Sequence, residues 1–143
     1  MKKKRFDEEI NDCPNNTISI KSHHQKYVVA ESSGEANANR DIVGLRETFT
    51  IEGRGVNTIA LKSQEGNYLV AEDSSTNYEV NANSDVIGEK ETFTVIKHAG
   101  GTVSFRTTYG RYLVAERDGR LRADRTWMRA WEKFSLECVN GKF

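Results

Sequence analysis

The chain has 143 residues, enough for one domain built around a single hydrophobic core. Its 21 lysines and arginines balance 21 aspartates and glutamates, so it lacks the basic excess that nucleic-acid binding usually requires. No apolar run approaches the length of a membrane span, and the basic cluster at residues 2–5 is not followed by the apolar stretch of a secretory signal. We therefore expect no nucleic-acid partner and no membrane span, and this start, taken as the native one, predicts a cytoplasmic protein.

Residues 1–16 are charged and end in Cys13-Pro14-Asn15-Asn16, a turn signal. We interpret them as a lead-in arm to a single domain at 17–143. The two cysteines, Cys13 and Cys138, are too few for a disulfide framework and have no metal-ligand spacing. We predict neither a metal site nor a cofactor.

Beyond the arm, the sequence repeats itself three times. Tyr-Val-Val-Ala-Glu at residues 27–31 recurs as Tyr-Leu-Val-Ala-Glu at 68–72 and 112–116, spaced 41 and 44 residues apart. Spacing of this size is typical of repeat architectures. The repeats run over about 17–57, 58–101 and 102–137.

Each repeat predicts four short strands in the same order. The first strand alternates apolar and polar residues, and the second is rich in β-branched and aromatic residues, as strands prefer. The strands are expected at 18–22, 27–31, 36–39 and 47–51, then at 59–63, 68–72, 80–83 and 91–95, and finally at 103–107, 112–116, 121–124 and 132–136. The second repeat has three extra residues in the turn at 73–79, and such insertions map to exposed loops.

Twelve short strands in three repeats predict an all-β fold, a β-trefoil. The first and fourth strands would close a small barrel, and the second and third would form hairpins that cap one end. Two core layers are expected, one from Phe49, Phe93 and Phe134 and one from Ile20, Leu61 and Phe105. Because the fold brings the first and last strands together, Cys13 and Cys138 would be neighbours, either as a closing disulfide or as two reduced thiols.

The repeat resembles that of the fascin family. The resemblance is carried by Lys-Ser-x-x-Gly-x-Tyr-Leu-Val-Ala-Glu at 62–72, Val-Asn-Ala-Asn at 80–83 and Gly-x-x-Glu-Thr-Phe-Thr-Val at 88–95, and it extends over about 17–137. Members of that family are β-trefoils, and its founding members bundle actin filaments. The single-trefoil relative hisactophilin binds actin at membranes.

This resemblance implies a non-catalytic binding module whose partner is an actin filament or a similar acidic protein surface. An oligosaccharide bound in repeat-related pockets between hairpins is the alternative, and a protein–protein interaction domain is the third possibility. No nucleophile–base or phosphate-binding glycine motif points to an enzyme.

Charge is uneven along the chain. Residues 58–97 carry a net charge of −4, and residues 102–137 carry a net charge of +3. The arginines expected to form a partner-binding cluster in the third repeat are Arg111, Arg117, Arg120, Arg122, Arg125 and Arg129. Arginine suits an acidic partner because its guanidinium can bind a carboxylate through two hydrogen bonds, but a solvated, salt-bridged surface is the ordinary alternative.

Four aromatic residues complete the candidates. Trp127 could stack on a sugar or plug one end of the barrel, whereas core packing is the favoured interpretation for Trp131. Tyr78, in the insertion, and Tyr109, in a turn, are expected to be exposed and available to a ligand.

Two sets of titratable residues are interpreted as structural or superficial. Glu31, Glu72 and Glu116 occupy threefold-related positions and are expected to stabilise their hairpins. The three histidines, His23, His24 and His98, fall in predicted turns, where we expect surface side chains rather than catalytic ones.

Overall fold

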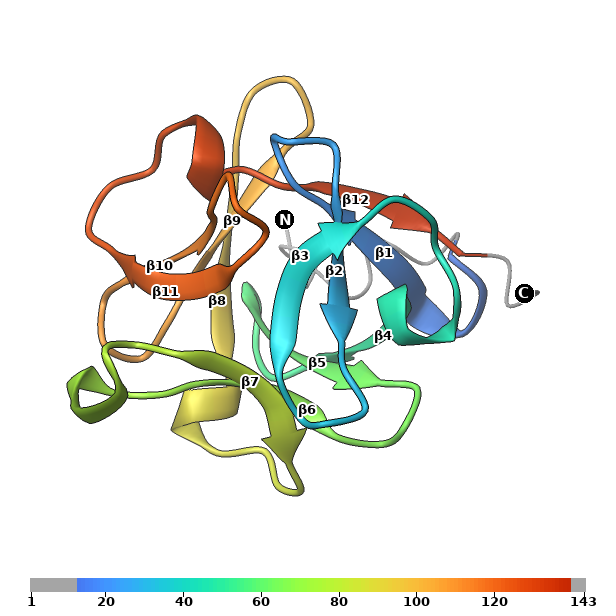
Figure 1. Ribbon diagram of the computed structural model, residues 1–143, viewed down its shortest axis with the longest axis horizontal. Coiled ribbons are helices and arrows are strands. Elements are labelled where there is room, and N and C mark those ends of the chain that lie inside the picture. The colour runs from blue at the N-terminus through green and yellow to red at the C-terminus, as the bar shows by residue number, and fades with distance from the viewer. Residues whose placement is uncertain (1–12, 140–143) are drawn as a thin grey trace.

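The computed structural model describes residues 13–139, and the fold of this region is all-β (Figure 1). Twelve antiparallel strands form one sheet, accompanied by five 3₁₀ turns of three residues each. The strands are β1 (Thr17–Lys21), β2 (Tyr27–Ala30), β3 (Ala36–Arg40), β4 (Phe49–Gly53), β5 (Thr58–Ser63), β6 (Tyr68–Ala71), β7 (Val80–Ser84), β8 (Phe93–Lys97), β9 (Val103–Arg106), β10 (Tyr112–Ala115), β11 (Leu121–Arg125) and β12 (Ser135–Cys138). The turns are η1 (Pro14–Asn16), η2 (Leu45–Glu47), η3 (Ser74–Thr76), η4 (Glu89–Glu91) and η5 (Ala130–Glu132). The predicted all-β class is confirmed.

The repeats pair their strands in the same register. Ile18 of β1 lies opposite Phe49 of β4, and β5 and β8 pair likewise. A bridge between Val103 and Phe134 occupies the corresponding place in the third repeat. Between repeats, β4 pairs with β5, β8 pairs with β9, and β12 pairs with β1. The first and last strands therefore lie side by side, as expected.

One continuous core fills the space between these strands. All six residues expected in the two core layers are fully buried, namely Phe49, Phe93, Phe134, Ile20, Leu61 and Phe105. Phe105 contacts both neighbouring rings, with centroid distances of 5.8 Å to Phe134 and 6.4 Å to Phe93. The aromatic contacts therefore run across the two expected layers and join them.

Three hairpins, β2–β3, β6–β7 and β10–β11, surround the centre of the molecule in Figure 1. A cycle of backbone hydrogen bonds links the turn of each hairpin to the next one. The N–H groups of Ala82, Ala123 and Ala38 donate to the carbonyls of Gly34, Tyr78 and Gly119, at 2.8, 3.1 and 2.8 Å. Each hairpin thus satisfies a buried backbone group of its neighbour.

The entry to each fourth strand differs from the prediction. Glu47, Glu91 and Glu132 were expected in strands, yet each ends a 3₁₀ turn and is buried. Their carboxylates accept hydrogen bonds of 2.7 Å from the backbone N–H three residues earlier. This local hydrogen bond competes with extension of the strand, so the chain turns before it enters the fourth strand of the repeat.

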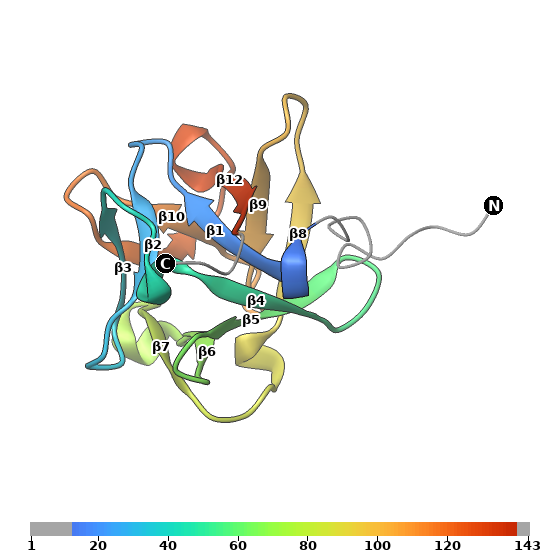
Figure 2. The ribbon, with the colours of Figure 1, turned by 90° about the vertical axis from the view of Figure 1, so that its right-hand side faces the viewer.

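A disulfide joins Cys13 to Cys138 across 125 residues of sequence (Figure 2 shows β1 and β12 side by side). Of the two alternatives for these cysteines, the disulfide is the one observed. Of residues 13–16, which were assigned from sequence to the arm, Pro14–Asn16 form η1 and Cys13 lies in the core. The rest of the arm, residues 1–12, lies outside the described residues.

The described part of the chain, residues 13–139, holds no helix with the length and apolarity that crossing a membrane would require.

Removing the disulfide by Cys13→Ala with Cys138→Ser should lower the free energy of unfolding by about 3–5 kcal/mol, because the bond closes a long loop in the unfolded chain. Urea denaturation measures the loss. A reductant should shift wild type to the midpoint of the variant and leave the variant unchanged. Equal midpoints for oxidised and reduced wild type would contradict the prediction.

Candidate ligand-binding site between the first two repeats

Three equivalent junctions lie where the 3₁₀ turn of one repeat meets the first turn of the next. At the first junction η2 meets residues 63–65, at the second η4 meets residues 107–108, and at the third η5 meets residues 22–23. Hollows of about 620, 410 and 350 Å³ lie at these three junctions. Of these hollows, the first alone is lined by the middle residue of its 3₁₀ turn, Arg46, and by the hairpin residues Ala30 and Arg40.

Two positions distinguish the junctions, the middle residue of the 3₁₀ turn and a residue of the facing turn. Arg46 and Glu65 occupy them at the first junction, whereas Trp131 and His24 occupy them at the third. At the second junction the corresponding residues are Lys90 and Tyr109. One backbone frame therefore carries three different side-chain pairs.

The third junction is filled by aromatic rings. The rings of Trp131 and His24 meet edge to face with centroids 4.9 Å apart. The Nε2 atom of His24 also lies 3.1 Å from the carbonyl oxygen of Ala115, within hydrogen-bonding distance. Trp131 is half-buried, so it packs between repeats rather than in the central core. This junction has the character of a structural contact.

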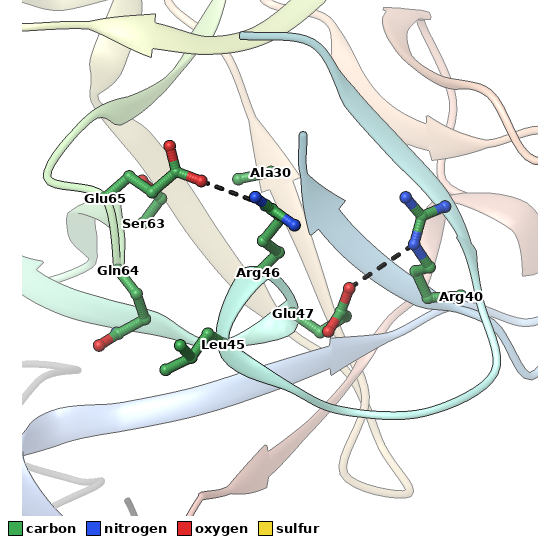
Figure 3. Close-up of a pocket in the computed structure, with 8 residues that line it drawn as sticks. All are labelled: Ala30, Arg40, Leu45, Arg46, Glu47, Ser63, Gln64 and Glu65. Atoms are coloured by element: carbon green, nitrogen blue, oxygen red, sulfur yellow. Dashed lines mark hydrogen bonds and ion pairs between the residues drawn. The ribbon is translucent and has the colours of Figure 1, made fainter. Parts of the chain in front are cut away.

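The first junction is open and polar (Figure 3). Arg46 Nε donates to Glu65 Oε1 at 3.2 Å, and the two side chains are 53% and 47% exposed. Leu45 lies at the edge of the hollow and is also exposed. Because an exposed ion pair contributes little to stability, Arg46 and Glu65 can exchange their mutual contact for contacts with a ligand.

The wall of this hollow is held more tightly than its opening. Arg40 Nη2 donates to Glu31 Oε1 at 2.6 Å, while Arg40 Nε lies 3.7 Å from Glu47 Oε2. Glu47 is in turn fixed by the N–H of Gly44. These bonds hold Arg40 and Glu47 in position before any ligand arrives, which lowers the entropic cost of binding.

The same wall recurs around the molecule with substitutions. In the third repeat Arg125 Nη2 donates to Glu116 Oε1 at 2.5 Å, and its Nε lies 3.8 Å from Glu132. In the second repeat Ser84 replaces the arginine and donates to Glu91 at 2.8 Å. The predicted hairpin-stabilising role therefore agrees with the bonds of Glu31 and Glu116. The Glu72 carboxylate makes no hydrogen bond or ion pair within residues 13–139.

The predicted arginine cluster does not form a single free basic patch. Arg125 contacts the carboxylates of Glu116, Asp124 and Glu132, and Arg120 is paired with Asp118. Arg122 lies 3.4 Å from Asp124 and donates to the carbonyl of Asn77. Much of the positive charge of the third repeat is thus balanced within the repeat. Arg117 lies exposed near the β10–β11 turn.

The two remaining arginines contact aromatic rings. Arg129 lies over the ring of Trp127 at 5.2 Å, and Arg125 approaches the same ring at 5.9 Å. Trp127 is 46% exposed, which is more than we expect of a side chain that plugs one end of the predicted barrel. Arg111 lies 4.8 Å from the ring centre of Tyr78. Tyr78 and Tyr109, expected to be exposed, are half-buried because their rings contact each other at 6.4 Å.

The histidines differ in exposure, although all three were expected to be surface side chains in turns. His23 is exposed, whereas His98 is half-buried with Nε2 2.7 Å from the hydroxyl of Ser104. Burial lowers the pKa of His98, and the nearby Lys133 lowers it further. The hydroxyl of Ser104 donates to the carbonyl of Glu132, so His98 belongs to a structural hydrogen-bond chain.

No group of three or more histidine, cysteine, aspartate or glutamate side chains within residues 13–139 is placed to hold a metal ion.

Comparison with known proteins places the chain in a family but gives it no function. Residues 14–139 match the family described as "Domain of unknown function (DUF7910)". Since this match spans most of the chain, the protein belongs to that family. No curated protein matches the sequence.

Sequence reasoning did not identify the first-junction site. Arg46 and Glu65 are 19 residues apart and belong to different repeats, so only the fold brings them together. A usable signal was present, because Arg46 and Lys90 stand where the third repeat has Trp131. A departure from a repeated pattern marks a place where packing alone does not dictate the residue.

Truncating the equivalent residues Trp131 and Arg46 should separate a structural junction from an open one. Trp131→Ala should cost about 2–3 kcal/mol because it empties a packed contact, whereas Arg46→Ala should change stability by less than about 0.5 kcal/mol. Urea denaturation of the two variants measures the difference. Equal losses of stability in the two variants would contradict the prediction, because they would show that side-chain packing stabilises both junctions to the same extent.

Proposed function

We propose that the chain is a fascin-type β-trefoil and a non-catalytic binding module. The matching registers of the three strand pairs support a pseudo-threefold arrangement. So does the cycle of hydrogen bonds that passes from each hairpin turn to the next hairpin. The return of β12 to β1 is what closure of such a barrel requires.

We further propose that its ligand is an oligosaccharide bound at the first junction. The supporting observation is the open hollow of about 620 Å³ at a place where the third repeat packs two aromatic rings. Such a volume lies within the range of known small-molecule sites. A position that is open in one repeat and filled by side chains in another is a suitable place for a ligand.

The chemistry of the lining suits a neutral, hydroxyl-rich molecule. Arg40 and Arg46 supply hydrogen-bond donors, Glu47 and Glu65 supply acceptors, and their formal charges cancel. Ser63 and Gln64 can do both. Sugar hydroxyls also donate and accept, whereas an anionic ligand would meet the two carboxylates. The balanced lining therefore favours a neutral saccharide over an acidic partner.

Two observations make an actin filament the weaker candidate. The ion pairs of Arg120, Arg122 and Arg125 reduce the free positive charge that an acidic protein surface would attract. The Cys13–Cys138 disulfide favours a non-reducing compartment, because cytosolic thiols are normally kept reduced. That preference runs against the cytoplasmic location expected from the sequence, and we propose an oxidising environment instead.

The proposed site is tested with neutral hexasaccharides of several linkages, such as cellohexaose, laminarihexaose, xylohexaose and hexa-N-acetylchitohexaose, by isothermal titration calorimetry. For the hexasaccharide that wild type binds, Arg46→Ala and Glu65→Ala should each weaken binding at least tenfold, because each removes a charged hydrogen-bonding group worth about 1.5–3 kcal/mol. Affinity should change little between low and high salt, since the ligand carries no charge.

Arg120→Ala is the matched control, because it also removes an exposed, paired arginine. Its affinity for the hexasaccharide should equal that of wild type. Co-sedimentation with actin filaments that weakens steeply with salt, together with no binding of any hexasaccharide, would overturn the proposal in favour of the filament.

A further inference from the structure

We infer that Tyr78, Tyr109 and Arg111 form a second binding site, an aromatic corner at the border of the second and third repeats, for a carboxylate-bearing sugar unit such as a hexuronic acid. The rings of Tyr78 and Tyr109 meet at 62° with centroids 6.4 Å apart. The guanidinium of Arg111 lies 4.8 Å from the ring centre of Tyr78. This inference rests on the proposed carbohydrate-binding function, but it concerns different residues and a different ligand class.

The backbone position of Tyr78 is the first reason to assign it a function. Its carbonyl accepts from Ala123 in the cycle of hydrogen bonds between hairpins, where the other two repeats use Gly34 and Gly119. Both glycines have a φ of +97°, and Tyr78 has a φ of +58°. A bulky residue in the left-handed region is strained, and such strain clusters at functional sites. Glycine would serve the fold better at this position.

The insertion of the second repeat holds the strained residue in place. Asp73 caps η3 by accepting from the N–H of Ser75 at 2.9 Å, and Asp73 O accepts from the N–H of Tyr78 at 3.0 Å. Arg122 of the third repeat donates to the carbonyl of Asn77 at 3.0 Å. The turn is therefore held by hydrogen bonds to both repeats, and the ring of Tyr78 lies against Tyr109 of the third repeat.

The third repeat supplies the rest of the corner. Arg111 Nη1 donates to the backbone carbonyl of Asp124 at 3.2 Å, and no carboxylate within residues 13–139 pairs with its guanidinium. The equivalent residues, Lys26 and Asn67, differ, since Lys26 is paired with Asp41 and Asn67 is uncharged. Arg111 thus keeps a positive charge that no carboxylate of the described chain neutralises.

These groups complement one kind of ligand. A pyranose ring presents an apolar face that can lie against tyrosine, and tyrosine hydroxyls can bond to sugar hydroxyls at the edge. A carboxylate on the same sugar can accept two parallel hydrogen bonds from a guanidinium. A neutral sugar would leave the charge of Arg111 unpaired, so a uronic acid is the better match.

The test compares trigalacturonic acid with its methyl ester, which lacks the charge, by calorimetry with the full chain. Wild type should bind the acid at least tenfold more tightly than the ester. Tyr78→Gly installs the residue used by the other two repeats, so the melting temperature should stay equal or rise while affinity for the acid falls at least tenfold. Arg111→Asn, which installs the residue of the second repeat, should abolish the preference for the acid.

Lys26→Asn removes a positive charge at the equivalent position of the first repeat and should leave binding unchanged. The inference is overturned if the acid does not bind, if Tyr78→Gly keeps full affinity, or if Tyr78→Gly melts at a markedly lower temperature. Arg46→Ala tells this site from the first junction, since it should spare the acid and weaken the neutral hexasaccharide. If wild type fails to bind only the neutral hexasaccharide or only the acid, the proposal for that ligand alone has failed.

Discussion

The fold depends on the fact that no repeat can bury its own apolar face. Each first strand pairs with the fourth strand of the preceding repeat, so Ile51 lies opposite Leu61, Val95 opposite Phe105, and Leu136 opposite Ile20. The hairpins obey the same rule through hydrogen bonds that run from one repeat to the next. Stability is therefore shared among all three repeats, and the closing contact between β12 and β1 is the one that a disulfide secures.

This shared frame explains why function is most reasonably sought where the repeats differ. Positions that the frame requires recur in every copy, such as the phenylalanines of the core and the buried glutamates that end η2, η4 and η5. Positions that the frame leaves free have diverged. The pairs Arg46–Glu65 and Trp131–His24 lie at equivalent positions, but one is charged and the other aromatic. The backbone therefore does not require a particular pair of side chains there.

The sequence was most informative about features that follow from periodicity. Alternating apolar residues and the recurring Val-Ala-Glu segment located the strands, and recurrence identified Phe49, Phe93 and Phe134 as core residues. It was least informative about charged residues that are buried in the folded chain. Glu132 is almost wholly buried because a backbone N–H and the side chain of Arg125 satisfy its carboxylate, and such partners are visible only in three dimensions.

Tyr78 shows how an insertion can create a site without disturbing the frame. The longer turn still delivers a carbonyl to Ala123, so the cycle of hydrogen bonds survives with a tyrosine in place of glycine. A glycine would satisfy the backbone but present no side chain, whereas the tyrosine adds a ring at the cost of a strained φ angle. Since Tyr109 and Arg111 come from the next repeat, the corner exists only when the second and third repeats are packed together. Binding there is therefore coupled to the same contact between repeats that stabilises the fold.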